Sequence, residues 1–316
     1  MNTASYNCPC CGGPLKFSGE SGKLECTACG NHYEPEALEM MTSDESGDEI
    51  TFANDAKRFD TGEAGMRAYL CKNCGAELMA DETAAAECPY CGSPTILPDR
   101  IEGGVKPEKV IPFVVTKEQA QKQFEDYFKG KKLLPNVFLN SRNRISEMRR
   151  LYVPYWLFSC DACADMVYDA EKVCTEQKGE WEITRTKHYL VRRRGGMRFE
   201  YIPVDGSVKM DDKLTESLEP YDLSAAIPFQ SAVLAGAMAD HADADCDACE
   251  KRAVERSVEQ TMLDTVRDYD TVNERNRRIV TERGSATPAL LPVWLMTTVK
   301  EGKTYTLAVN GQTGKL

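Results

Sequence analysis

The chain has 316 residues, 14 of which are cysteines, and a formal net charge of −11 at pH 7. Residues 1–100 carry 7 Lys/Arg against 17 Asp/Glu, which argues against a nucleic-acid-binding module because such modules present basic surface to phosphates. The sequence shows no secretory leader and no run of about 18 apolar residues. We therefore expect a soluble, cytosolic protein, long enough to form more than one domain.

Two cysteine-rich segments come first, and each holds two CxxC pairs. The pairs are separated by 14 residues in the first segment and by 13 in the second. Cytosolic reductants disfavour disulfides, and two such pairs are typical of a tetrahedral zinc site with four thiolate ligands. We predict two structural Zn²⁺ ions per chain, held by Cys8, Cys11, Cys26 and Cys29 in one site and by Cys71, Cys74, Cys88 and Cys91 in the other.

Glycine follows the second cysteine of every pair, at Gly12, Gly30, Gly75 and Gly92. A tight turn that aims backbone N–H groups at the sulfurs needs a residue that tolerates positive φ. A redox dithiol is the rival interpretation, but redox proteins use one CxxC pair at a helix start rather than two spaced sets. The same pattern makes Cys10 the spare thiol of the first segment. Four sulfur ligands leave no open position for a substrate, so catalytic zinc is not expected.

We divide the chain into a zinc ribbon at 1–40, an acidic linker at 41–66, a second ribbon at 67–100 and an α+β domain at 101–316. In that last domain a buried strand is expected over 109–115. A Thr116-x-x-Gln119 capping box follows and opens a helix that stops at Gly130. A second apolar strand is expected over 151–158.

The second half of this domain shows a predicted hairpin with arms at 181–191 and 197–201 and Gly195-Gly196 at its turn. A long helix then carries an apolar stripe from Val254 to Tyr269, and two strands, 290–299 and 304–309, close the chain. The stretches VIPF…VPYWLF and AIPF…LPVWLM echo each other. Two explanations remain open: an internally duplicated unit, or a coincidental similarity between the apolar sequences of buried strands.

Two weaker site hypotheses remain open. Two further CxxC pairs could form a third metal site, or they could be ordinary buried thiols; they are Cys160, Cys163, Cys246 and Cys249. A basic cluster could bind anions, or it could be a solvated hairpin end; it comprises Arg192, Arg193, Arg194 and Arg198. The dispersed histidines form no nucleophile–histidine–acid arrangement, no ATPase motif is present, and no small-molecule substrate can be named.

Several motifs together resemble a bacterial family of double-zinc-ribbon proteins. They are CPCCGGPL, CKNCGAEL, CPYCGSPTILPDRI, KVIPFVVTKEQA, YVPYWLF and the closing VNGQTGK. Members are labelled as transcription-factor-B-type zinc ribbons or as primosomal-helicase-like proteins. They often continue into C-terminal membrane spans and are encoded near SPFH and phage-shock genes. The resemblance therefore implies a membrane anchor beyond Leu316 and membrane-associated SPFH or phage-shock proteins as partners.

These observations predict a non-enzymatic zinc-binding adaptor that mediates protein–protein interactions at the cytoplasmic face of the membrane. The alternative is a nucleic-acid-binding zinc-ribbon factor in replication or transcription. That alternative requires a local basic surface despite the acidic total charge.

Overall fold

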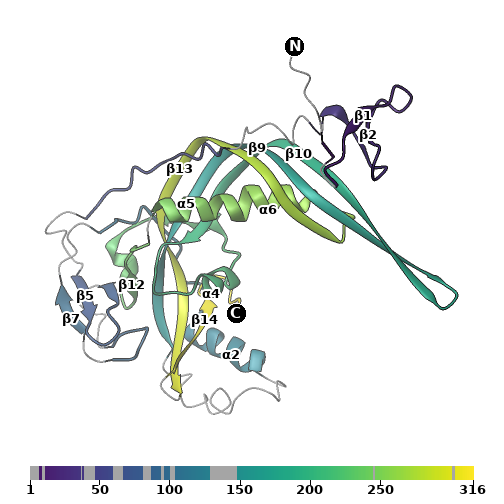
Figure 1. Ribbon diagram of the computed structural model, residues 1–316. Coiled ribbons are helices and arrows are strands. Elements are labelled where there is room, and N and C mark those ends of the chain that lie inside the picture. Colours follow the sequence, from purple (N-terminus) through teal and green to yellow (C-terminus); the bar gives the residue numbers. More distant parts are fainter. Residues whose placement is uncertain are drawn as a thin grey trace. The chain divides into compact units, whose positions relative to one another are not determined.

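The structure is a computed structural model that describes residues 7–8, 11–36, 38, 47–59, 67–80, 87–93, 96–99, 104–128, 148–244, 246–300 and 303–316. Cys10, the predicted spare thiol, lies outside these residues. The described part of the chain carries two tetracysteine clusters. Its secondary structure is mostly β, with a few helices (Figure 1). The fold has more strand and less helix than the expected α+β class, because the apolar segments after residue 148 continue into very long strands.

The chain forms two compact units that are interleaved in sequence. The first comprises Met1–Glu49, Cys163–Gly196 and Met262–Val280, and the second comprises Ile50–Ala162, Met197–Thr261 and Thr281–Leu316. The first unit contains a small antiparallel sheet in the order β1-β2-β3. Its strands are β1 (Leu15–Phe17), β2 (Leu24–Cys26) and β3 (His32–Tyr33).

Long strands dominate the fold: β9 (Arg149–Lys178), β10 (Trp181–Asp205) and β13 (Thr271–Lys300). The predicted turn at Gly195-Gly196 is wrong, because both glycines lie inside β10. The chain reverses instead at Gly179 and Glu180, where Gly179 has φ +66°. A glycine adopts this left-handed conformation without steric cost.

Within the described residues, the main sheet follows the order β11-β8-β13-β9-β12-β6-β5-β7, with β10 beside β9 and with β14 and β4 beside β13. The segment expected to be a linker contributes to it, since Phe52 of β4 is buried and its ring lies 5.1 Å from that of Phe158. The shorter strands are β4 (Phe52–Ala53), β5 (Arg67–Cys71), β6 (Glu77–Ala80), β7 (Ile96–Asp99), β8 (Lys109–Val110), β11 (Ile227–Pro228), β12 (Met238–Asp240) and β14 (Lys303–Asn310).

The helices follow the local sequence signals closely. Helix α2 (Lys117–Phe128) is opened by the predicted capping box, in which the Thr116 N–H donates to Gln119 Oε1 at 2.8 Å and the Gln119 N–H donates to Thr116 Oγ1 at 3.3 Å. The predicted strand before it shrinks to β8, at Lys109–Val110. A short helix, α4 (Asp212–Ser217), begins after Asp211, whose carboxylate caps it.

The predicted long helix is present as α5 (Cys246–Val254), a π-helical segment (Glu255–Glu259) and α6 (Gln260–Asp264). Its stripe is buried at Val254, Val258 and Met262. The predicted stripe extended to Tyr269, which lies beyond the end of α6. None of the helices in the described part of the chain has the length and apolar character that crossing a membrane requires.

The closing VNGQTGK segment forms a turn that the side chain of Asn310 holds by hydrogen bonds. Asn310 is fully buried, and its side-chain amide donates to the Leu218 carbonyl at 2.9 Å and to the Pro220 carbonyl at 3.3 Å. Its side-chain oxygen accepts from the N–H groups of Gln312 and Thr313 at 2.8 and 2.9 Å. One buried side chain thus satisfies four backbone groups in two segments.

Asn310→Ala should lower the free energy of unfolding by about 2–3 kcal/mol, because it leaves buried backbone groups without partners. Urea unfolding followed by circular dichroism measures the change. The control is Asn54→Ala at an exposed position, which should stay within about 0.5 kcal/mol of wild type. Equal losses in both variants would contradict the role assigned to Asn310.

Candidate metal centres

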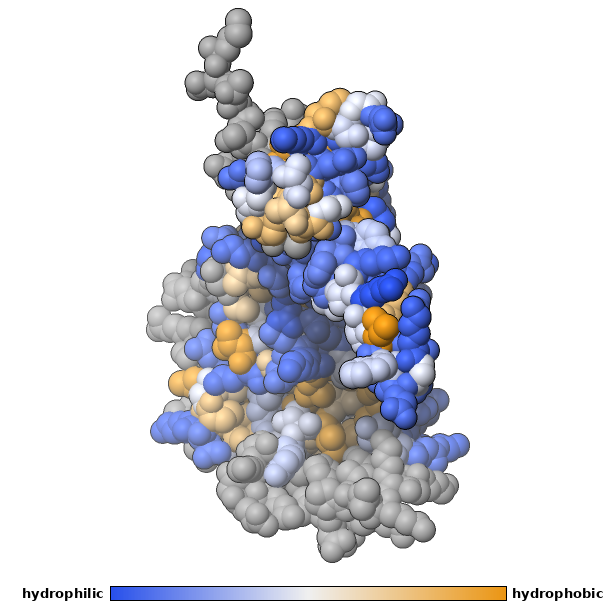
Figure 2. All heavy atoms as spheres, turned by 45° about the vertical axis from the view of Figure 1, so that its right-hand side comes forward, coloured by the Kyte–Doolittle hydropathy of each residue, from blue (hydrophilic) through white to orange (hydrophobic). Residues whose placement is uncertain are grey.

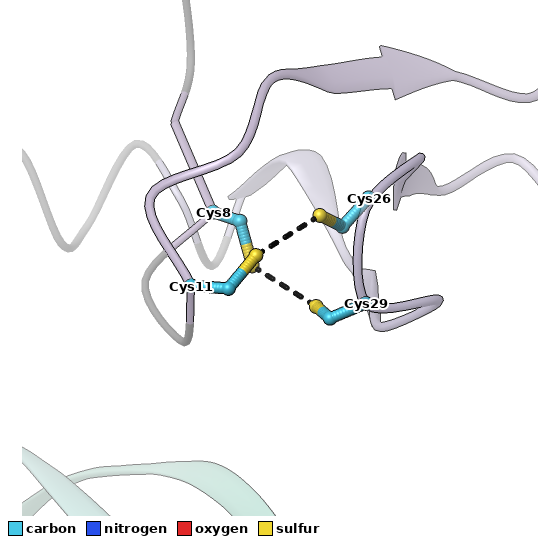
Figure 3. Close-up of side chains that lie close together, drawn as sticks. All are labelled: Cys8, Cys11, Cys26 and Cys29. Atoms are coloured by element: carbon cyan, nitrogen blue, oxygen red, sulfur yellow. Dashed lines mark hydrogen bonds between the residues drawn. The ribbon is translucent and has the colours of Figure 1, made fainter.

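The first cluster joins the two CxxC pairs of the first segment. The Cys8 and Cys29 sulfurs lie 3.6 Å apart, and those of Cys11 and Cys26 lie 3.5 Å apart (Figure 3). All four sulfurs lie within 4.8 Å of one another. A tetrahedron with Zn–S bonds of about 2.3 Å has edges of about 3.8 Å, so the sulfurs lie close to the positions that a zinc ion demands.

The second cluster repeats this geometry. The Cys71 and Cys91 sulfurs lie 3.6 Å apart, as do those of Cys74 and Cys88, and all four fall within 4.8 Å. Each cluster could therefore bind one metal ion, and a set of four sulfur donors suits zinc.

All four CxxC turns share one backbone pattern. The N–H of each trailing glycine donates to the carbonyl of the first cysteine of its pair, at 2.8–3.0 Å. The four glycines have φ between +68° and +74°, which confirms the need for a residue that tolerates positive φ. They are Gly12, Gly30, Gly75 and Gly92. The repeated turn explains how short local sequences can position all eight sulfurs.

The two clusters differ in their surroundings. In the first, Cys11 and Cys29 are exposed to solvent. In the second, Cys71 and Cys88 are fully buried in the same hydrophobic core as Leu151, Tyr155 and other residues of the main sheet. The second cluster is therefore part of the core of the second unit, whereas the first belongs to the first unit, beside its small three-stranded sheet.

Two cationic side chains, which no local sequence signal predicted, hold the second cluster in place. Lys209 Nζ donates to the Cys74 carbonyl at 3.0 Å, and Arg149 Nη1 donates to the Cys88 carbonyl at 3.3 Å. Both come from positions far from the knuckles in sequence, so spacing rules could not find them. A positive charge close to a site with four thiolates also offsets part of its negative charge.

Burial raises the pKa of the Cys74 thiol to about 11 and that of Cys88 further above its ordinary value. Buried thiolates without a cation are costly. A bound metal ion removes this cost because it holds its sulfur ligands deprotonated. The donor set and its burial therefore fit a metal ion.

A buried polar network adjoins the second cluster. Tyr90, within the Cys88–Cys91 knuckle, donates its hydroxyl to Asp240 Oδ2, which also accepts from Ser207 Oγ at 2.5 Å. The Ser207 N–H donates to Asp205 Oδ1 at 2.9 Å. Burial raises the pKa of Asp205 to about 7 and that of Asp240 to about 6. Tyr90 is part of the CPYC motif, but its hydrogen-bond partner Asp240 lies 150 residues away in the sequence, so no local pattern predicts the network.

The pairs proposed as a third metal site are not brought together. In the described residues only the two clusters above group three or more ligating side chains closely. Cys160 is buried on β9, and Cys249 is buried on α5, where its thiol donates to the Asp205 carbonyl at 3.5 Å. Cys163 is exposed and Cys246 half-buried.

Three of the four predicted anion-binding arginines lie close to carboxylates, and the fourth contacts a backbone carbonyl. Arg192 makes a bidentate contact with Asp165, with Nε–Oδ1 at 2.7 Å and Nη2–Oδ2 at 2.5 Å. Arg198 Nε lies 2.8 Å from Asp161 Oδ1. Arg194 lies 3.9 Å from Asp165, and Arg193 donates to the Thr265 carbonyl at 3.4 Å. The cluster lies along a strand and not at a hairpin end, and these contacts partly neutralise it.

The fold and the paired cysteines define a mostly-β protein with two tetracysteine clusters of the zinc-ribbon kind. The chain is 34% identical over 315 residues to the uncharacterized protein YdjG of Bacillus subtilis (strain 168). The aligned region covers 99% of this chain and 88% of that protein. The chain therefore belongs to the YdjG family. No family model matches the chain, and no solved structure matches it.

The buried carboxyls predict a pH dependence of stability. A raised pKa means that the folded state holds more protons than the unfolded state, so this stabilisation is present at low pH and is lost as the pH rises through about 6–7. Asp205→Asn should reduce the loss of unfolding free energy between pH 5.5 and pH 8 by on the order of 2 kcal/mol. Urea unfolding at both pH values with zinc in excess measures it.

The matched control is Asp55→Asn, which changes an exposed carboxylate. It should leave the pH dependence of wild type unchanged. A pH dependence in Asp205→Asn equal to that of wild type would mean that Asp205 titrates in the folded state as it does in the unfolded chain.

Proposed function

We propose that the protein is a non-enzymatic zinc-binding adaptor that mediates protein–protein interactions at the cytoplasmic face of the membrane. The observation that carries this proposal is the free end of the β9–β10 hairpin. All residues from 172 to 182 are exposed, and Figure 1 shows this end continuing as two strands beyond the end of β13. A two-stranded ribbon is only marginally stable in water, so a partner that covers it would stabilise both of its strands.

The tip of this hairpin carries an interface-type side chain. Trp181 is 77% exposed, the highest value among the large hydrophobic residues in the described part of the chain. Val173, five residues before the end of β9, is 42% exposed. Exposed tryptophans are typical anchors of protein interfaces because they bury a large area with little entropy loss. On the face of the molecule in Figure 2, hydrophobic residues form only small separate groups among hydrophilic ones. On this face, a localised anchor therefore fits better than a broad apolar surface.

Zinc serves a structural role in this proposal. Each tetracysteine cluster has a complete set of four sulfur ligands, so a bound Zn²⁺ ion would have no open position for substrate. The membrane context and the SPFH or phage-shock partners rest on the sequence resemblance. The adaptor proposal itself rests on the hairpin.

The zinc-loaded chain should contain about two equivalents of zinc by elemental analysis. Cys11→Ser should lose about one equivalent and keep the cooperative unfolding of the second unit, because the first cluster lies in the first unit. Cys88→Ser should lose zinc and also destabilise the second unit strongly, because the Cys88 sulfur lies in the core of that unit. Cys10→Ser is the matched control and should keep two equivalents. Equal damage from Cys11→Ser and Cys88→Ser would contradict this division.

Trp181→Ala should abolish most partner recovery when the full-length protein is cross-linked and captured from membranes. Zinc content and thermal unfolding should remain those of wild type, since Trp181 contributes little to the core. Val208→Ala, at a position 67% exposed outside the hairpin, is the control and should retain the partner. The adaptor proposal fails if the captured proteins are the same with and without Trp181, and nucleic-acid binding that weakens steeply with salt would favour the alternative factor.

A further inference from the structure

A pocket of about 370 Å³ opens in the second unit beside the Cys88–Cys91 turn of the second cluster. Buried apolar side chains form one part of its lining, and they are Met148, Met238 and Trp294. Cationic side chains form another part, and they are Lys117, Arg149 and Arg150. The lining also includes Glu87, whose carboxylate pairs with Arg149. The volume falls within the range of small-molecule sites, and the lining combines apolar residues with charged ones.

Arg150 stands out among these cations. Its Nε atom is buried and has no hydrogen-bond partner, and no carboxylate pairs with Arg150 among the described residues. Arg149, the residue next to it, instead pairs with Glu87 and with the Cys88 carbonyl. A buried donor without a partner costs free energy. An arginine whose Nε has no partner therefore lies at the pocket beside one whose terminal nitrogens are both paired.

The guanidinium of Arg150 is held in place by aromatic rings. Its Cζ atom lies 4.6 Å from the centroid of the Phe113 ring and 6.0 Å from that of Trp294. The two rings lie 5.3 Å apart edge to face, and Trp294 Nε1 donates to the Val115 carbonyl at 2.9 Å. Stacking on aromatic faces fixes the plane of the guanidinium and leaves its N–H edge available.

Backbone packing in turn fixes the Phe113 ring. A Cβ atom at Gly311 would lie 2.6 Å from Phe113 Cε1, so only glycine allows this ring position. The N–H groups of Val114 and Val115 both donate to the Gly311 carbonyl, at 3.0 and 2.8 Å. The glycine of the VNGQTGK turn thus supports the ring on which Arg150 stacks, so the arginine is preorganised before any ligand arrives.

We propose that this pocket binds a small carboxylate with an apolar body. The fixed guanidinium of Arg150 donates to the carboxylate, for which its planar fork is suited. Met148, Met238 and Trp294 contact the apolar body of the ligand. This inference is independent of the adaptor proposal, because it involves neither the hairpin nor Trp181.

Isothermal titration calorimetry of the zinc-loaded full chain tests the proposal with 3-phenylpropionate and hexanoate as probes. Both carboxylates should bind, whereas 3-phenylpropanamide and hexanamide, which keep the apolar body and lose the charge, should bind at least about tenfold more weakly. Inorganic phosphate, which has charge without an apolar body, should also bind more weakly. Equal affinity for acids and amides, or no binding of either acid at millimolar concentration, would overturn the proposal.

Arg150→Gln should weaken binding of 3-phenylpropionate about tenfold or more, and Arg150→Lys should weaken it several-fold because the planar fork is lost. The matched control is Arg185→Gln, which removes the same charge from an exposed position on β10 and should leave the affinity unchanged. Equal losses in Arg150→Gln and Arg185→Gln would show a general charge effect and contradict the site. Should Arg150→Gln unfold, the comparison of acids with amides on wild type still decides the question.

Discussion

The fold depends above all on how the second tetracysteine cluster is built into the main core. Cys71 and Cys88 are fully buried among residues of the central strands, including Leu151 and Tyr155. Two of the four thiols are buried and two are half-buried, and holding them as thiolates without a cation is costly. A metal ion that organises these sulfurs therefore stabilises the turn and also the core that surrounds it. In small isolated zinc modules metal binding supplies the folding free energy. A metal ion bound at the second cluster would couple in the same way to the stability of a large β domain, because Cys71 and Cys88 lie in its core.

A second constraint is the charge arrangement along β9. The strand alternates, so the even residues from 160 to 170 are buried while acidic residues occupy odd positions on the other face. Arginines from both neighbouring strands meet these carboxylates: Arg192 contacts Asp165, and Arg275 Nη1 lies 3.0 Å from Asp169 Oδ1. Partly exposed pairs of this kind add little stability individually. Their stronger effect is on strand register, because a shift by one residue would move every carboxylate to the buried face.

The parts that the sequence predicted well are those decided within a few residues. The four cysteine knuckles with their trailing glycines and the Thr116–Gln119 capping box depend only on local backbone geometry. The hairpin turn was misplaced because Gly179 and Gly195-Gly196 are equivalent as local signals. What decides between them is the pairing of β10 with β9 over its length, and this is a long-range property. The same reason hides Arg150, whose significance comes from Phe113 and Trp294, distant in sequence.

The second cluster and the proposed carboxylate pocket share structural parts, which makes their energetics inseparable. Glu87 and Pro89 line the pocket, and they flank Cys88 on either side. Arg149 lines the pocket and also donates to the Cys88 carbonyl. A carboxylate bound beside Arg150 would therefore rest partly on a wall whose position the metal fixes. Linkage is reciprocal, so a ligand that binds better to the metal-loaded wall must raise the metal affinity of the second cluster by the same factor. The first cluster contributes no residue to the pocket, so its metal affinity gives the internal reference for that coupling.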